Sequence, residues 1–118
     1  MDKNTLSERF INLSLDIIQL FKLVPQEFEF EVIRKQIIRS SMSAGANYRA
    51  ACRAKSTADF IYKLKVVAEE IDETMYWMEV TERLFENDSI GKIKKETNEL
   101  TSIIVSSIKT SIHRSNKS

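Results

Sequence analysis

The sequence predicts an all-α protein, an antiparallel up-down-up-down four-helix bundle formed as a single domain over residues 1–118. Only two glycines and one proline occur in the chain, which favours long uninterrupted helices over the many turns of an all-β fold. Apolar residues recur at the three- and four-residue steps of a helix face in four successive segments. Short polar connections join the segments, so neighbouring helices are expected to run antiparallel.

The first two helices are expected over about residues 6–24 and 29–54. The first carries a stripe of six apolar residues, namely Leu6, Phe10, Leu13, Ile17, Leu20 and Val24. Ser7 or Thr5 can cap its start, and Pro25 ends it, because proline disfavours helical geometry at the preceding residue. The second half of the second helix is rich in small residues and contains Gly45. A glycine inside a helix costs about 1 kcal/mol relative to alanine, so we expect close packing of a neighbouring helix there.

The third and fourth helices are expected over about residues 57–86 and 90–113. Ser56 and Asp59 form a capping-box-like pair at the start of the third helix, with the acid where the helix dipole favours it. This helix is apolar over so wide an arc that neighbours must cover it on more than one side. The segment 87–89 is a polar turn, and the isoleucine-rich stripe that follows defines the fourth helix.

Several functional classes find no support in the sequence. Cys52 is the only cysteine, so an internal disulfide and a cysteine-based zinc site are excluded, and a reducing cytoplasm is the expected compartment. The N-terminus lacks the apolar core of a signal peptide, and no run of 18 apolar residues could span a membrane. His113 is the only histidine, which leaves the acids of the third helix without the Glu-x-x-His pairs of a di-iron bundle. We expect no metal, no cofactor, no small-molecule substrate and no enzymatic activity.

The second and third helices carry a resemblance to a known family. The sequence over residues 37–51 reads IIRSSMSAGANYRAA, and RAKS and DFIYKL follow it at residues 53–56 and 59–64. The run ETMYWME then occupies residues 73–79. In this order and over nearly the whole chain, the sequence resembles the bacterial four-helix-bundle proteins encoded within intervening sequences of 23S ribosomal RNA genes, also labelled S23 ribosomal proteins.

The resemblance implies a four-helix bundle without enzymatic activity that assembles into a ring, typically a homopentamer. A related branch comprises the accessory variability proteins of diversity-generating retroelements, which pair with a reverse transcriptase and are strongly basic. The present chain departs from that branch, because its formal net charge is only +1.

Charge is distributed very unevenly along the chain despite this small total. Residues 34–65 hold eight basic side chains and one acid, whereas residues 66–88 hold eight acids and one base. In the predicted bundle, the end of the second helix, the start of the third and the end of the fourth meet at one end of the molecule. We call this end the basic pole, and its residues are Arg49, Arg53, Lys55, Lys63, Lys65, Lys109, Arg114 and Lys117.

The basic pole supports two hypotheses. Arg49, Arg53, Lys55, Lys63 and Lys65 could contact the phosphates of RNA or DNA, and a ring would repeat these contacts around its axis. Alternatively the charges form a solvated surface, with Arg34, Lys35 and Arg39 pairing with acids of the third helix. The first reading predicts a protein that binds nucleic acid or a nucleic-acid-handling protein; the second predicts a structural oligomer or scaffold that binds only protein.

Two further groups of residues are candidates for structural contacts. Asn47 is expected to form a hydrogen bond with Glu70 or Glu73 across the second and third helices, because a buried amide needs a partner. Tyr76, Trp77 and Met78 are consecutive, so they point about 100° apart and cannot all face one core. Either Tyr76 or Trp77 should therefore point outward, towards another subunit of the oligomer.

Overall fold

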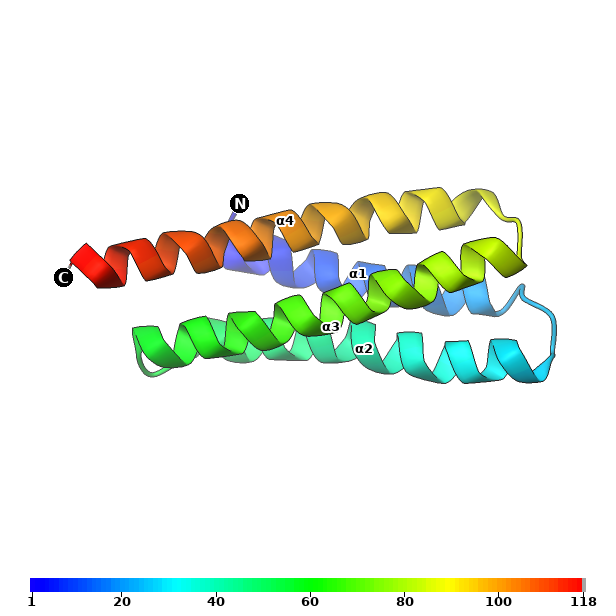
Figure 1. Ribbon diagram of the computed structural model, residues 1–118, viewed down its shortest axis with the longest axis horizontal. Helices are drawn as coiled ribbons and strands as arrows, with labels where there is room; N and C mark the ends of the chain where they lie inside the picture. Colours follow the sequence, from blue (N-terminus) through cyan, green and yellow to red (C-terminus); the bar gives the residue numbers. More distant parts are fainter. Residues whose placement is uncertain (118) are drawn as a thin grey trace.

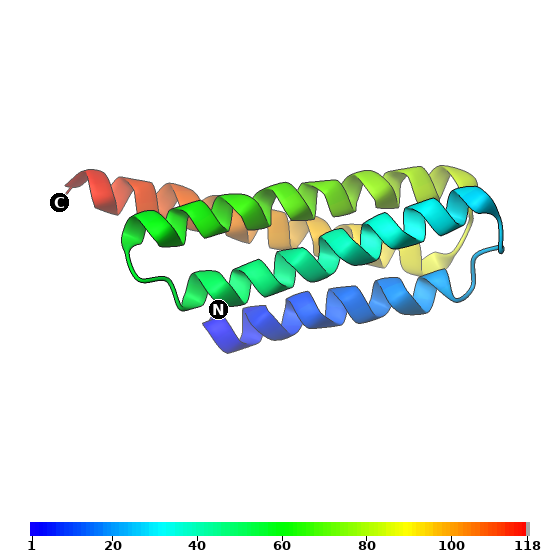
Figure 2. The ribbon, with the colours of Figure 1, turned by 90° about the horizontal axis from the view of Figure 1, so that it is seen from below.

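The computed structural model describes residues 1–117, which form four helices and three short connections. The helices are α1 (Lys3–Phe21), α2 (Phe28–Cys52), α3 (Thr57–Leu84) and α4 (Asp88–Lys117). They lie side by side in a bundle measuring 53 × 22 × 20 Å, and each helix runs antiparallel to the one before it (Figures 1 and 2). The predicted all-α class and the up-down-up-down topology are confirmed.

α1 begins earlier and ends earlier than predicted. Its cap is Asp2, whose side chain accepts a hydrogen bond of 2.8 Å from the backbone N–H of Thr5, so the prediction of Ser7 or Thr5 as the cap was wrong. The helix ends at Phe21, three residues before Val24. There the amides of Lys22 and Leu23 bond to carbonyls three residues earlier, which tightens the last turn before the chain reaches Pro25.

The other helix ends differ from prediction by a few residues. α2 ends at Cys52 rather than near residue 54, and α3 ends at Leu84 rather than near residue 86. α4 is longer than predicted at both ends, because its polar first and last turns extend the helix into solvent without adding to the apolar stripe. The predicted cap of α3 is confirmed, since Ser56 Oγ accepts a hydrogen bond of 3.0 Å from the amide of Asp59.

The apolar stripes meet along the axis of the bundle and form a continuous core. The predicted stripe of α1 is buried from Leu6 to Leu20, with side chains no more than 4% exposed. α2 and α3 pack against each other over the largest surface, whereas α1 and α4 touch least. No helix within residues 1–117 is long and apolar enough to cross a lipid bilayer.

Gly45 lies where α1 and α2 approach each other closely. A Cβ atom added at this position would lie 3.1 Å from the Cβ of Phe10, which is 1% exposed and stacks on Tyr48 with ring centroids 5.4 Å apart. The expected close packing at this glycine is therefore present, and the neighbour that requires it belongs to α1.

Candidate functional site

The basic pole lies at the end of the bundle where α2 turns into α3. The C-terminal end of α4 reaches the same end and projects beyond the other helices, and the N-terminus lies there as well (Figure 1). The arrangement follows from the topology, because an up-down bundle brings the second turn and both chain termini to one end. The fold thus brings together the basic residues that are far apart in the sequence.

Three of the predicted phosphate-binding residues are exposed and form no ion pair in the described part of the chain. Arg49 lies in the last turn of α2, Arg53 is its C-cap residue, and Lys55 lies in the turn that follows. None of the three side chains forms an ion pair within residues 1–117. Solvent ions gather at exposed charges of this kind, and a phosphate backbone could displace them.

The two lysines of α3 differ from these three. Lys63 forms an ion pair with Asp59, one turn earlier, at Nζ–Oδ distances of 2.6 and 2.7 Å. This hydrogen bond lowers the pKa of Asp59 below its usual range, so the pair stays charged. Lys65 is exposed, but it is two residues from Lys63 and so points to the opposite side of α3. Within the predicted set, Arg49, Arg53 and Lys55 form the unpaired part of the patch.

A shallow cavity of about 440 Å³ adds two cations to the same end. Lys3 at the start of α1, Lys55 in the α2–α3 turn and Arg114 near the end of α4 all line it. Lys3 was missing from the predicted set, because the apolar stripe of the first helix starts only at Leu6. The earlier start of α1 places Lys3 beside the other basic residues.

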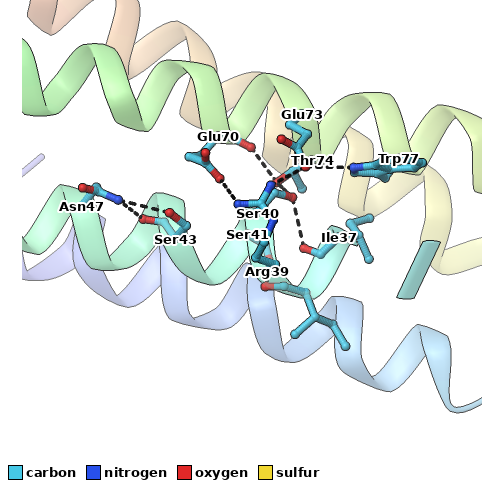
Figure 3. A network of polar contacts seen from close by, with 11 residues as sticks. Ile37, Arg39, Ser40, Ser41, Ser43, Asn47, Glu70, Glu73, Thr74 and Trp77 are labelled. Carbon is cyan, nitrogen blue, oxygen red and sulfur yellow. Dashed lines mark hydrogen bonds and ion pairs between the residues drawn. The ribbon is translucent and has the colours of Figure 1, made fainter. Parts of the chain in front are cut away.

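A chain of buried hydroxyl groups crosses the bundle about halfway along α2. Ser14 of α1 donates to Ser41 of α2 at 3.3 Å. Ser40 of α2 lies 2.8 Å from the hydroxyl of Thr74 on α3 (Figure 3). Thr74 in turn donates to the carbonyl of Glu70 at 2.9 Å. We call these four side chains the hydroxyl layer. The two contacts between helices, Ser14–Ser41 and Ser40–Thr74, join α1 to α2 and α2 to α3 at this height and so favour this lengthwise register.

The predicted bond between Asn47 and Glu70 or Glu73 was wrong. The Asn47 amide donates to the carbonyl and the hydroxyl of Ser43, within the same helix, at 2.9 and 3.2 Å (Figure 3). A side chain this short satisfies its donor most easily on the preceding turn of its own helix.

Arg39 supplies the contact between α2 and these two acids. It donates to Glu70 at 3.0 Å and to Glu73, and Glu73 also accepts a bond of 3.1 Å from the indole N–H of Trp77 (Figure 3). These bonds, from Trp77 first and then Arg39, lower the pKa of Glu73. The expected pairing of Arg39 with acids of the third helix is confirmed. For Arg34 and Lys35 it was wrong, because both pair with Glu31 of their own helix.

The aromatic pair Tyr76 and Trp77 divides between surface and core. Trp77 is half-buried and packs against the core, whereas Tyr76 is 57% exposed. The two rings meet edge to face with centroids 5.0 Å apart, so Tyr76 is held against the edge of a fixed indole. Of the two residues expected at a subunit interface, Tyr76 is the one that points outward.

The opposite end of the molecule carries the acids. Glu82 pairs with Lys94 at 2.8 Å, and Glu29 raises the pKa of Glu27 through a side-chain hydrogen bond and charge repulsion. Within residues 1–117, no three acidic, histidine or cysteine side chains lie close enough to hold a metal ion.

Comparison with known proteins places the chain in a family. Residues 2–106 match the family described as 23S rRNA-intervening sequence protein. This chain belongs to that family. Its structure is also similar to the crystal structure of a protein of unknown function from the S23 ribosomal protein family of Bacteroides thetaiotaomicron, with 34% sequence identity and a TM-score of 0.81. The similarity covers 92% of this chain and 99% of the other. No protein with a curated description matches.

Both family findings agree with the resemblance in the SAGAN and ETMYWME segments. The family match extends from the cap of α1 into α4, so it includes the hydroxyl layer, the α2–α3 turn and all five predicted phosphate-binding residues.

Proposed function

We propose that this protein acts without catalysis, as a ring-like homo-oligomer whose copies present their basic poles to nucleic acid or to a protein that handles nucleic acid. The observation that carries the proposal is the set of unpaired cations at the α2–α3 turn, Arg49, Arg53 and Lys55. The cations Lys3 and Arg114 in the adjoining cavity extend that positive surface. The family description, which names a 23S rRNA intervening sequence, supports a ribonucleic acid context.

The proposed contact is electrostatic and weak for a single copy. A protein that neutralises Z phosphates of a duplex shows a slope of about −0.9Z when the logarithm of affinity is plotted against the logarithm of salt concentration. Three unpaired cations per copy give a shallow slope and weak binding. A ring would hold several poles towards one polyanion, and linked contacts multiply affinity without any new contact.

The test is binding of labelled structured RNA and of duplex DNA, measured by fluorescence anisotropy over a range of salt concentrations. We expect the double variant Arg53→Glu and Lys55→Glu to lose binding at low salt. Unchanged binding in this variant would refute the role of the basic pole.

The matched control changes two exposed lysines at or near the acidic end, in the variant Lys22→Glu and Lys95→Glu. It alters the net charge by the same amount, so equal losses in both variants would show only a general charge effect. The expected result is a loss confined to the basic pole.

A scaffold that binds only protein is the alternative function, and the internal pairing of basic residues favours it. Arg34, Lys35, Arg39 and Lys63 all form ion pairs with acids of the same chain, so half of the basic block between residues 34 and 65 serves the fold. Absence of any nucleic-acid binding at low salt, together with an intact oligomer, would support this alternative.

A further inference from the structure

An apolar groove lies between α1 and α2 on the side of the bundle. It has a volume of about 310 Å³, and its walls include Ile11, Leu15 and Met42, which are 39%, 51% and 47% exposed. Gly45 also lines the groove. Three exposed apolar side chains on adjoining turns of two helices are more than scattered surface residues, and such patches mark interaction sites.

A second apolar feature lies on a different face of the molecule. Tyr76 belongs to the outermost stripe of α3, and α2 separates α3 from α1 (Figure 2). Its contact with Trp77 limits the freedom of the ring, so little conformational entropy is lost when a partner covers it. An exposed and pre-positioned tyrosine is typical of the anchor residues of interfaces.

The hydroxyl layer places the groove and the tyrosine at matching heights along the bundle. Leu15 adjoins Ser14, Met42 adjoins Ser41, and Tyr76 is two residues from Thr74, so each lies within about 3 Å of the layer. Met42 and Tyr76 fall on opposite sides of the layer. The side chains of a helix lean towards its N-terminus. Because α2 and α3 run antiparallel, the side chains of Met42 and Tyr76 lean towards each other along the bundle axis and end at about the same height.

Charge distinguishes the two features and makes them complementary. The groove ends at Arg49, which forms no ion pair in residues 1–117. Tyr76 is flanked on the exposed surface of α3 by Glu69, Asp72 and Glu79, which also form no ion pair there. If Tyr76 of one copy entered the groove of another, its acidic neighbours would lie beside the basic Arg49. Opposite charges at the edge of an interface favour such a contact, whereas like charges would disfavour it.

From these observations we infer that the α1–α2 groove of one copy receives Tyr76 of a second copy of this chain. The inference rests on the proposed oligomeric assembly and names the surfaces that build it. Because groove and tyrosine lie on different faces, the contact is heterologous, and heterologous contacts produce rings when the rotation closes. Equal heights allow parallel copies to repeat the contact by rotation alone, with no shift along the bundle.

The experiment measures the mass of the whole protein in solution, by light scattering or sedimentation, for two single-site variants. Met42→Glu blocks the groove and leaves Tyr76 intact, whereas Tyr76→Glu blocks the tyrosine and leaves the groove intact. We expect each variant alone to be a monomer. An equimolar mixture should form a one-to-one dimer and nothing larger, because only one groove and one tyrosine in each pair remain competent.

Two further variants keep the test decisive. Tyr62→Glu changes a tyrosine on the same stripe of α3 that is even more exposed, at 67%, and lies near the turn; it should leave the mass unchanged. Leu15→Glu blocks the same groove from α1 and should behave as Met42→Glu does, and circular dichroism shows that each variant remains folded.

The outcomes separate the interface from the assembly. If the unaltered protein is an oligomer and Tyr76→Glu and Met42→Glu both retain its mass, the inference is wrong while the assembly stands. If both variants are monomers but their mixture forms no dimer, the heterologous contact is wrong. If the unaltered protein is a monomer, the ring and this inference both fail, and binding at the basic pole remains to be judged by its own salt dependence.

Discussion

Replacing Gly45 by alanine tests whether close packing of α1 against α2 outweighs helix propensity. Alanine is favoured over glycine by about 1 kcal/mol in the interior of a helix, so propensity alone predicts a more stable protein. The added methyl group would lie 3.1 Å from the Cβ of Phe10, closer than ordinary contact. A Cβ cannot move away without its backbone, and Phe10 is fully packed, so α1 must shift. Forced repacking of this kind costs typically 1–3 kcal/mol.

The net expectation for Gly45→Ala is a loss of about 1 kcal/mol, the difference between the packing cost and the gain in propensity. Gly91→Ala is the matched control, because a Cβ at Gly91 meets nothing within 4 Å and this glycine also lies in a helix. We expect it to gain about 0.5 kcal/mol. In a domain of this size the two variants should then differ in Tm by about 6 °C.

The assay is urea denaturation followed by circular dichroism, with both variants compared at equal chain concentration because assembly also contributes to stability. The m-values should match, which shows that the change lies in stability and not in the extent of unfolding. If Gly45→Ala is as stabilising as Gly91→Ala, the packing argument at the α1–α2 contact is refuted.

Other consequences of the polar contacts can be measured in the same way. Thr74→Val keeps the shape of the side chain but removes the bond to Ser40, and it should cost about 1 kcal/mol in urea denaturation; no loss would show that the hydroxyl layer does not stabilise the bundle. Arg9 of α1 donates a hydrogen bond of 2.8 Å to Glu96 of α4, and this bond lowers the pKa of Glu96. Glu96 therefore stabilises the fold at neutral pH, and its contribution is lost as the pH falls through the lowered pKa. Thermal unfolding of Arg9→Met should consequently depend less steeply on pH between about 5 and 3 than that of the unaltered protein, and equal slopes would contradict the assignment. Asp2→Ala should speed amide exchange in the first turn of α1 while Asp2→Asn should not, since asparagine also accepts the capping bond.

The fold was predictable from the sequence because burial in this bundle follows helical spacing closely. The stripe from Leu6 to Leu20 is buried as expected, and the turn at Asn87 is used to start α4, where its side chain accepts a bond of 2.9 Å from the amide of Ser89. Helix ends were predicted less well. The polar turns at the ends of α1 and α4 contribute nothing to an apolar stripe, so spacing gives no sign of them.

The partners of polar side chains were harder to predict than the core. Asn47 and Arg39 both lie on the side of α2 that faces α3, and the sequence alone could not say which would reach Glu70. The long guanidinium spans the gap between helices, whereas the short amide turns back to Ser43. Likewise Lys63 and Lys65 look equivalent in a list of charges, and only the position of Asp59 one turn before Lys63 separates them. The α1–α2 groove could not be foreseen, because spacing identifies apolar residues but not which of them a fourth helix leaves uncovered.

The charge pattern explains how a chain with a net charge of only +1 could serve both proposed contacts. The charges are separated in two directions. Along the bundle, cations gather at the α2–α3 turn and acids at the other end. Across the bundle, Arg49 lies at the rim of the groove, and Glu69, Asp72 and Glu79 surround Tyr76 on α3. In a ring of parallel copies, each contact would place Arg49 of one copy beside the acids around Tyr76 of the next. The charges that are separated across the width of the bundle would then neutralise each other. The charges that are separated along the length of the bundle would instead add up, because every copy would present Arg53 and Lys55 on the same side of the ring. In an antiparallel assembly, the basic end of one copy would lie beside the acidic end of the next, so the charges along the bundle would be neutralised as well. Parallel packing is therefore the arrangement that leaves a charged end for a polyanion.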